Sequence, residues 1–205
     1  MPPGHRHRLA LAAIAWCAAS VAWAALVGVS SLVAGLVASS VALVAFGANS
    51  ILDGTASGVL VWRFRHERPG ADVAAVERRA ALAVGIVMIA VALWIAASAV
   101  SALAAHSVPE ASLVGIVLTT ASLLVLPVLA RAKLRLVAPL RSPGLRGDGV
   151  LSFAGAVLAA ATLLSLVLDA SLDWWWADAI AALLISALLL VEASRTIASR
   201  RSLTR

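Results

Sequence analysis

An apolar stretch with an acidic residue near its middle sets the first constraint on this chain. Residues 39–63 read SSVALVAFGANSILDGTASGVLVWR, a run long enough to cross the apolar core of a bilayer as one helix. The run contains Asn49 and Asp53, and an ionisable side chain at that depth costs roughly 2.5–3.5 kcal/mol on insertion scales. Residues that carry such a cost inside a membrane segment mark functional sites, so Asp53 is the first candidate residue.

Two stripes run side by side along this predicted helix. The first is polar, because Asn49, Asp53 and Ser57 follow one another at intervals of four residues and therefore share a face. The second is a ladder of small residues with the same spacing: Ser50, Gly54 and Gly58. Small residues at this spacing let a second helix approach closely. The pattern predicts a polar site beside a tight helix–helix contact.

Composition places the whole chain in a membrane. The 205 residues are 62% hydrophobic and their mean hydropathy is +1.02, which is outside the range of soluble domains. Lys and Arg outnumber Asp and Glu by 16 to 10, but they gather in short segments between apolar runs, so they indicate membrane orientation rather than nucleic-acid binding. The single cysteine, Cys17, excludes a disulfide framework and is expected to be a packing residue.

The apolar runs predict an all-α, polytopic membrane protein with six transmembrane helices. The approximate ranges are 9–33, 39–62, 80–105, 111–130, 145–168 and 174–193. Basic residues fall in both ends of the chain and in the segments 63–79 and 131–146, which are predicted to be cytoplasmic loops. The expected topology is therefore a single transmembrane domain over 1–205, in the plasma (inner) membrane, with both termini cytoplasmic and no C-terminal cytoplasmic domain.

A second pair of polar residues opens the fifth predicted helix. Asp148 and Ser152 are again four residues apart, within GDGVLSFAGAVLAAA at 147–161. The two pairs can face each other, so that Asp53 and Asp148 supply charge while Asn49 and Ser152 supply neutral oxygens. A dication between two carboxylates would be locally neutral, which makes the pair tolerable in a low dielectric.

Structural roles are the alternatives for both carboxylates. Asp148 lies near a loop, where it can cap the fifth helix or pair with Arg146, and Asp53 can hydrogen-bond a neighbouring helix. Asp178 is predicted to cap the sixth helix rather than to bind an ion. The His5–His7 pair is read as part of a solvated basic tail, with metal capture as the alternative.

These motifs resemble the transmembrane domain of the cation diffusion facilitator family. The resemblance rests on the two pairs, on the small-residue approach SSVALVAFGANSILDG, on SGVLVWR after it and on WWWADAIAALLIS, and it covers nearly the whole chain. The family has six helices and a four-ligand metal site, with DxxxD on the second helix and HxxxD on the fifth. The corresponding positions here are Asn49, Asp53, Asp148 and Ser152.

The resemblance implies a secondary transporter that exports a divalent cation in exchange for protons, usually as a homodimer. No bound cofactor is implied. Because the family histidine is replaced by Asp148, the predicted site has only oxygen donors, which favour Mn²⁺, Fe²⁺ or Mg²⁺ over Zn²⁺.

Other functions remain open from the sequence. A membrane scaffold or partner protein of the same fold, with a degenerate site, is the main alternative to a transporter. A permease for a small polar solute is disfavoured because the remaining helices carry few polar residues. An enzyme is not expected, since the predicted spans contain no histidine, no nucleophile–base pair and no HExxH motif.

Overall fold

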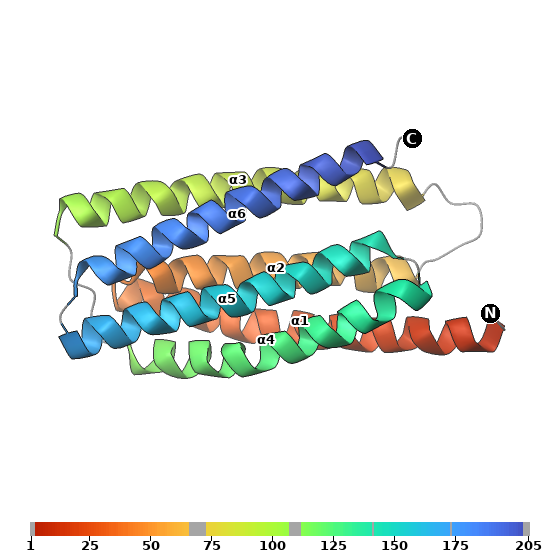
Figure 1. Cartoon of the computed structure of the whole chain (residues 1–205), viewed down its shortest axis with the longest axis horizontal. Helices are drawn as coiled ribbons and strands as arrows, with labels where there is room; N and C mark the ends of the chain where they lie inside the picture. Colours follow the sequence, from red (N-terminus) through yellow and green to blue (C-terminus); the bar gives the residue numbers. More distant parts are fainter. Residues whose placement is uncertain (1–2, 66–72, 107–111, 141, 173, 203–205) are drawn as a thin grey trace.

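The protein is a bundle of six long helices. The computed structural model describes residues 3–65, 73–106, 112–140, 142–172 and 174–202, and every regular element in these ranges is an α-helix. The helices are α1 (Pro3–Val37), α2 (Val41–Arg65), α3 (Val73–Ala104), α4 (Leu113–Leu140), α5 (Pro143–Leu172) and α6 (Trp176–Ser202). They lie along the long axis of the molecule, and α1 begins at the same end of the bundle where α6 ends (Figure 1). The fold predicted from the apolar runs is confirmed.

The bundle is built from three closely packed pairs of helices. These pairs are α1–α2, α4–α5 and α3–α6. The first two pairs join through α1–α4 and α2–α5 contacts to form a group of four helices, while α3 and α6 pack along one side of that group (Figure 1). The predicted polar residues of α2 and α5 therefore lie inside one four-helix group.

Small residues bring α1 and α2 into close contact, as the sequence predicted for the small-residue face of α2. A Cβ atom added at Gly54 would lie 2.7 Å from the Cβ of Ala24 in α1. At Gly47, an added Cβ would come within 2.9 Å of the carbonyl oxygen of Gly28. Backbones that approach this closely leave no room for larger side chains, so these glycines set the distance between the two helices.

The turn between α1 and α2 is tied to the start of α6. Ser40 caps α2, since its Oγ accepts a hydrogen bond of 3.1 Å from the backbone N–H of Leu43. Asp178 of α6 accepts bonds from the Ser40 hydroxyl at 2.5 Å and from the backbone N–H of Ala42 at 3.1 Å. Asp178 was expected to cap its own helix; the structure corrects this, because its carboxylate instead satisfies free donors at the N-terminus of α2.

Within the part of the chain that the structure describes, five helices are long and apolar enough to cross a membrane. They are α1, α2, α4, α5 and α6, and the apolar described part of α3 is Met88–Ala104. Several helices extend beyond the predicted ranges, with α1 beginning at Pro3 and α5 ending at Leu172. The loop predicted over 63–79 is shorter, because α2 continues to Arg65 and α3 begins at Val73. Residues 66–72, which include Pro69-Gly70, and residues 107–111 lie outside the described residues.

The largest difference from the sequence prediction is at the end of α4. A basic loop was predicted over 131–146, but α4 continues to Leu140 and α5 begins at Pro143. The segment from 131 to 140 reads RAKLRLVAPL, which is rich in good helix formers. Arg131 and Arg135 are exposed whereas Lys133 is fully buried. The segment therefore has one exposed and one buried face, as expected for a helix packed against its neighbours.

Candidate cation site

Six side chains from four helices form a buried polar cluster within the α1–α2–α4–α5 group. They are Cys17 of α1, Asp53 and Ser57 of α2, Lys133 of α4, and Asp148 and Ser152 of α5. None of them is more than 4% exposed. We refer to these six residues as the polar cluster.

Lys133 lies at the centre of the polar cluster. Its Nζ is 2.7 Å from Oδ2 of Asp148, and both side chains of this ion pair are at most 1% exposed. The ammonium also donates to Oγ of Ser57 at 3.0 Å and to Oγ of Ser152 at 2.9 Å. An ammonium has three N–H donors, so three acceptors from two helices satisfy it completely.

Hydroxyl groups link the two carboxylates across the contact between α2 and α5. Ser152 donates to Oδ1 of Asp53 at 3.0 Å, and Ser57 donates to Oδ1 of Asp148 at 2.7 Å. Each bond pairs a serine of one helix with an aspartate of the other. The thiol of Cys17 lies 3.6 Å from Oδ2 of Asp148, so this residue also joins the polar cluster instead of being only a packing residue. Of the four residues predicted from the sequence, Asp53, Asp148 and Ser152 are thus brought together.

Asn49, the fourth predicted residue, is buried but stands apart from these bonds. It is 1% exposed, and its Oδ1 has no hydrogen-bond partner among the described residues. It lies one helical turn before Asp53 on α2, and a Cβ atom added at Gly155 of α5 would be 3.6 Å from its Nδ2. A buried carbonyl oxygen without a donor is unfavourable, and a cation or a water at this position would remove that cost.

The contacts of Asp148 differ from the two structural roles considered for it, which were capping the fifth helix and pairing with Arg146. Its ion pair is with Lys133, whereas Arg146 is exposed. The N-terminus of α5 is capped by Ser142, whose Oγ accepts a bond of 3.3 Å from the backbone N–H of Leu145. Asp148 is therefore held by a partner on another helix, not by its own loop.

The charges of the polar cluster do not cancel if both carboxylates are ionised. Asp53 and Asp148 then carry two negative charges against the one positive charge of Lys133. Among the described residues, the carboxylate of Asp53 contacts the neutral hydroxyl of Ser152, whose Oγ lies 3.0 Å from Oδ1 and 3.4 Å from Oδ2. An unbalanced charge in a low-dielectric interior is costly, so the polar cluster favours a further positive charge near Asp53.

The donor set for a metal ion is sparse. Among the described residues, no group of three or more His, Cys, Asp and Glu side chains is placed to hold a metal. A cation here would be held by two carboxylates, neutral oxygens and water. Such ligands are typical of Mg²⁺ and Mn²⁺ sites and poor for zinc, which prefers nitrogen and sulfur.

The sequence did not single out Lys133, because residues 131–146 were predicted to be a cytoplasmic loop. Two signals in the sequence could have found it. Lys133 is the only lysine in the chain. It also continues a buried stripe of α4 at intervals of three and four residues, comprising Thr119, Ser122, Leu126, Leu129 and Lys133.

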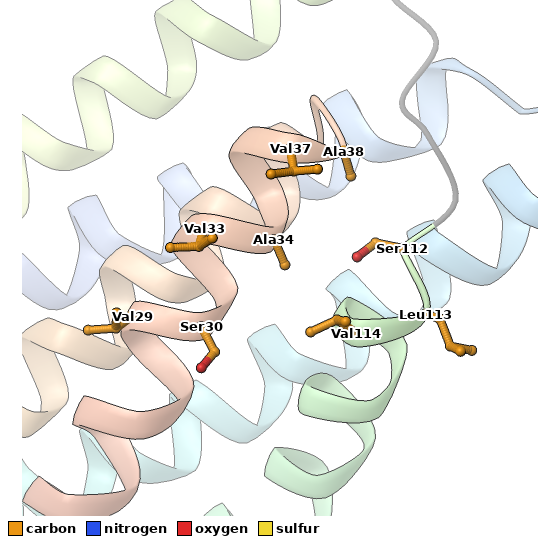
Figure 2. A pocket seen from close by; sticks show the side chains of 9 residues that line it. All are labelled: Val29, Ser30, Val33, Ala34, Val37, Ala38, Ser112, Leu113 and Val114. Atoms are coloured by element: carbon orange, nitrogen blue, oxygen red, sulfur yellow. The ribbon is translucent and has the colours of Figure 1, made fainter.

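A separate groove opens between α1 and α4, near the α1–α2 turn. Its volume is about 570 Å³, and it is lined mostly by apolar side chains that include Val29, Val33 and Val114 (Figure 2). Only Ser30 and Ser112 contribute polar atoms from their side chains. The groove contains no residue of the polar cluster, and its lining offers no charged group that would hold a cation.

Comparison with known families agrees with the fold. The family profile described as the cation efflux transmembrane domain matches residues 17–203, which span α2 to α6 completely and most of α1. A search of curated proteins found no match. Because the family profile covers nearly all of the 205 residues, the chain belongs to the cation efflux (cation diffusion facilitator) family of metal cation transporters.

Proposed function

We propose that this protein exports a divalent cation across the plasma membrane in exchange for protons, and that the cation binds at the polar cluster. The observation that carries the proposal is the meeting of two buried carboxylates, Asp53 of α2 and Asp148 of α5, within one network of hydroxyl groups. Polar side chains at this depth are costly and mark ion pathways in membrane proteins. The family supports the same conclusion.

The proposed ligands are Asp53, Asp148 and Ser152, with the unpaired carbonyl oxygen of Asn49 one turn away along α2. Two carboxylates around a dication make a neutral unit, which can exist in the membrane interior. The hard oxygen donors favour Mn²⁺, Fe²⁺ or Mg²⁺ over Zn²⁺. Selectivity would therefore differ from that of a site with a histidine ligand.

Protons complete the proposed cycle. A carboxylate that has lost its cation in a low dielectric gains stability by binding a proton. The next dication would displace that proton, so the same carboxylates bind the cation and the protons in turn. We further propose that the protein acts as a homodimer with both termini in the cytoplasm, as the family resemblance and the basic segments imply.

A second candidate function is supported by the Lys133–Asp148 ion pair. With its ammonium fully hydrogen-bonded, the polar cluster holds together without any bound ion. A family member that no longer transports, and serves instead as a membrane partner protein, would have this property. The two functions differ in whether an added cation enters the polar cluster.

Transport by purified protein in liposomes tests the proposal. We expect Mn²⁺ added on one side to be taken up while a pH-sensitive dye trapped inside reports proton movement in the opposite direction. Asp53→Asn keeps the side-chain shape but removes a charge, so uptake and proton movement should both fall at least tenfold, to the level of empty liposomes. Glu192→Gln is the matched control, because Glu192 pairs with exposed Arg195 outside the polar cluster.

Two results would contradict the proposal. If the wild-type protein moved none of Mn²⁺, Fe²⁺, Mg²⁺ and Zn²⁺, the partner-protein function would be favoured. If Asp53→Asn transported at the wild-type rate, the cation would not depend on the polar cluster. Size-exclusion chromatography of each variant shows whether a loss of transport is a loss of folding.

A further inference from the structure

We propose that Lys133 is a tethered competitor of the transported cation: its ammonium occupies the place of the cation, and the two bind in turn. The inference rests on the proposed function, because it uses the same site. It goes further by assigning a role to a residue of α4, a helix that contributes none of the ligands predicted from the sequence.

The contacts of Lys133 make the competition direct. Two of its three acceptors, Asp148 and Ser152, are proposed ligands of the cation. A metal ion bound to these oxygens would lie within a few ångströms of the ammonium, and the two positive charges would repel each other. The third acceptor, Ser57, also donates a hydrogen bond to Asp148. Polar groups of both α2 and α5 therefore surround the ammonium. Simultaneous binding at these oxygens is therefore excluded.

A lysine can leave this position without unfolding the helix. Lys133 lies seven residues before the end of α4 at Leu140, a rise of roughly 10 Å along the helix. Its side chain is long and flexible, and lysines near helix ends place their ammonium at the aqueous interface while the apolar stem stays buried. Once displaced, the ammonium would turn toward the inner end of α4. Arg63 already hydrogen-bonds Ser142 at this end of the bundle, which shows that polar side chains are accommodated there.

Competition by a tethered group has a specific consequence for the site. The ammonium is present at a high effective concentration, since it cannot diffuse away. It therefore weakens the apparent binding of the cation and speeds its release. It also keeps Asp148 paired whenever the cation is absent, so the empty site never exposes two unpaired carboxylates to the membrane interior.

Cation binding to the purified full chain in lipid nanodiscs tests the inference. We expect Lys133→Met, which keeps an unbranched side chain one atom shorter and removes the charge, to bind Mn²⁺ at least tenfold more tightly than the wild type. Lys133→Gln, which keeps a hydrogen-bond donor, should behave in the same way. Arg135→Met is the matched control, because Arg135 is an exposed basic residue on the same helix, and it should change binding less than twofold. Adding Asp53→Asn to Lys133→Met should abolish the tightened binding.

The wild-type chain allows a second measurement that needs no substitution. Because Lys133 is the only lysine, acetylation by an amine-reactive ester followed by mass spectrometry of the peptides reports on one side chain. The buried ammonium should be protected in the absence of metal. Saturating Mn²⁺ should increase its labelling severalfold, because the displaced ammonium moves toward water.

The outcomes separate this inference from the proposed function. Equal Mn²⁺ binding by the wild type and both Lys133 variants, with no change in labelling, would overturn the role of Lys133 and leave the transport proposal standing. Tight binding by the Lys133 variants alone would support the competition and show that the wild-type site is held closed by its own lysine. No binding by any variant, for any of the four metals, would overturn both.

Discussion

Two helix contacts in this bundle both contain fully buried side chains and yet differ in what they demand of the sequence. The contact between α3 and α6 is apolar: its buried faces carry Met88, Ala92, Ile95 and Ala99 on α3, and Ala182, Ile185, Leu189 and Ala193 on α6. The contact between α4 and α5 instead contains the ion pair of Lys133 and Asp148.

The two contacts differ in whether lipid could take the place of the residues that form them. Lipid tails are as apolar as leucine, so the α3–α6 faces gain mainly from close packing, and each residue contributes a part. In the polar cluster each group satisfies another, so removal of one member leaves a charge or a donor unpaired in the interior. We therefore expect losses at the α3–α6 contact to be gradual and losses in the polar cluster to be abrupt.

The abrupt case is tested by Asp148→Ala, for which we expect the largest loss of stability. The substitution removes the counter-charge of the Lys133 ammonium, which must then stay buried unpaired or give up its hydrogen bonds to Ser57 and Ser152. Breaking comparable buried pairs costs roughly 3–5 kcal/mol. Unfolding in detergent micelles, followed by circular dichroism, measures the loss. The double variant Asp148→Ala/Lys133→Met removes both charges and should recover most of the stability.

A surface pair gives the control for this prediction. Glu192→Ala removes the partner of Arg195, whose side chain is 68% exposed, and should change stability by less than about 1 kcal/mol. If the double variant of Asp148 and Lys133 were less stable than Asp148→Ala alone, the two charges would not be a mutually dependent pair and the comparison would fail.

The gradual case is tested by Ile185→Ala on α6. Ile185 is fully buried against the apolar core, so the truncation should cost about 2–4 kcal/mol through lost contacts and the cavity that remains. Leu184→Ala is its matched control, since Leu184 is the preceding residue of α6 and is 56% exposed. Mn²⁺ binding should be unchanged in both variants. A loss of binding in Ile185→Ala without a loss of stability would show that this contact also shapes the cation site.

The same two contacts show what could be predicted from the sequence. Hydropathy predicted six helices and the fold, because a membrane-crossing helix needs a long apolar run that few other structures contain. The spacing of Asp53, Asp148 and Ser152 predicted which helix faces meet, since residues four apart share a face. These features depend only on local sequence.

The remaining features depend on tertiary structure. Charge alone could not distinguish buried Lys133 from exposed Arg131 and Arg135, because the face on which each lies is set by how α4 packs against its neighbours. In the same way, the free N–H groups that Asp178 satisfies belong to α2, a helix far away in the sequence. The metal-binding role of Asn49, Asp53, Asp148 and Ser152 stays a prediction.

Ser186→Ala tests the smallest expected effect. Ser186 donates a hydrogen bond of 2.8 Å to the backbone carbonyl of Ala92 and is a polar residue on the α3–α6 contact. The carbonyl lies well inside α3 and keeps its own helical partner when the hydroxyl is removed, so neither a charge nor an unpaired acceptor is left behind. Hydrogen bonds between membrane helices contribute about 0.6 kcal/mol on average, and we expect a loss of that order in micelle unfolding.

The control for Ser186 is Ser194→Ala, whose hydroxyl bonds within its own helix to the carbonyl of Val191 and should have almost no effect. A loss at Ser186 as large as that at Asp148 would show that a neutral bond can be as indispensable as the ion pair. The abrupt loss of stability would then not require a charge. A loss near zero to 1 kcal/mol would instead place the abrupt behaviour in the charged groups, as the network around Lys133 predicts.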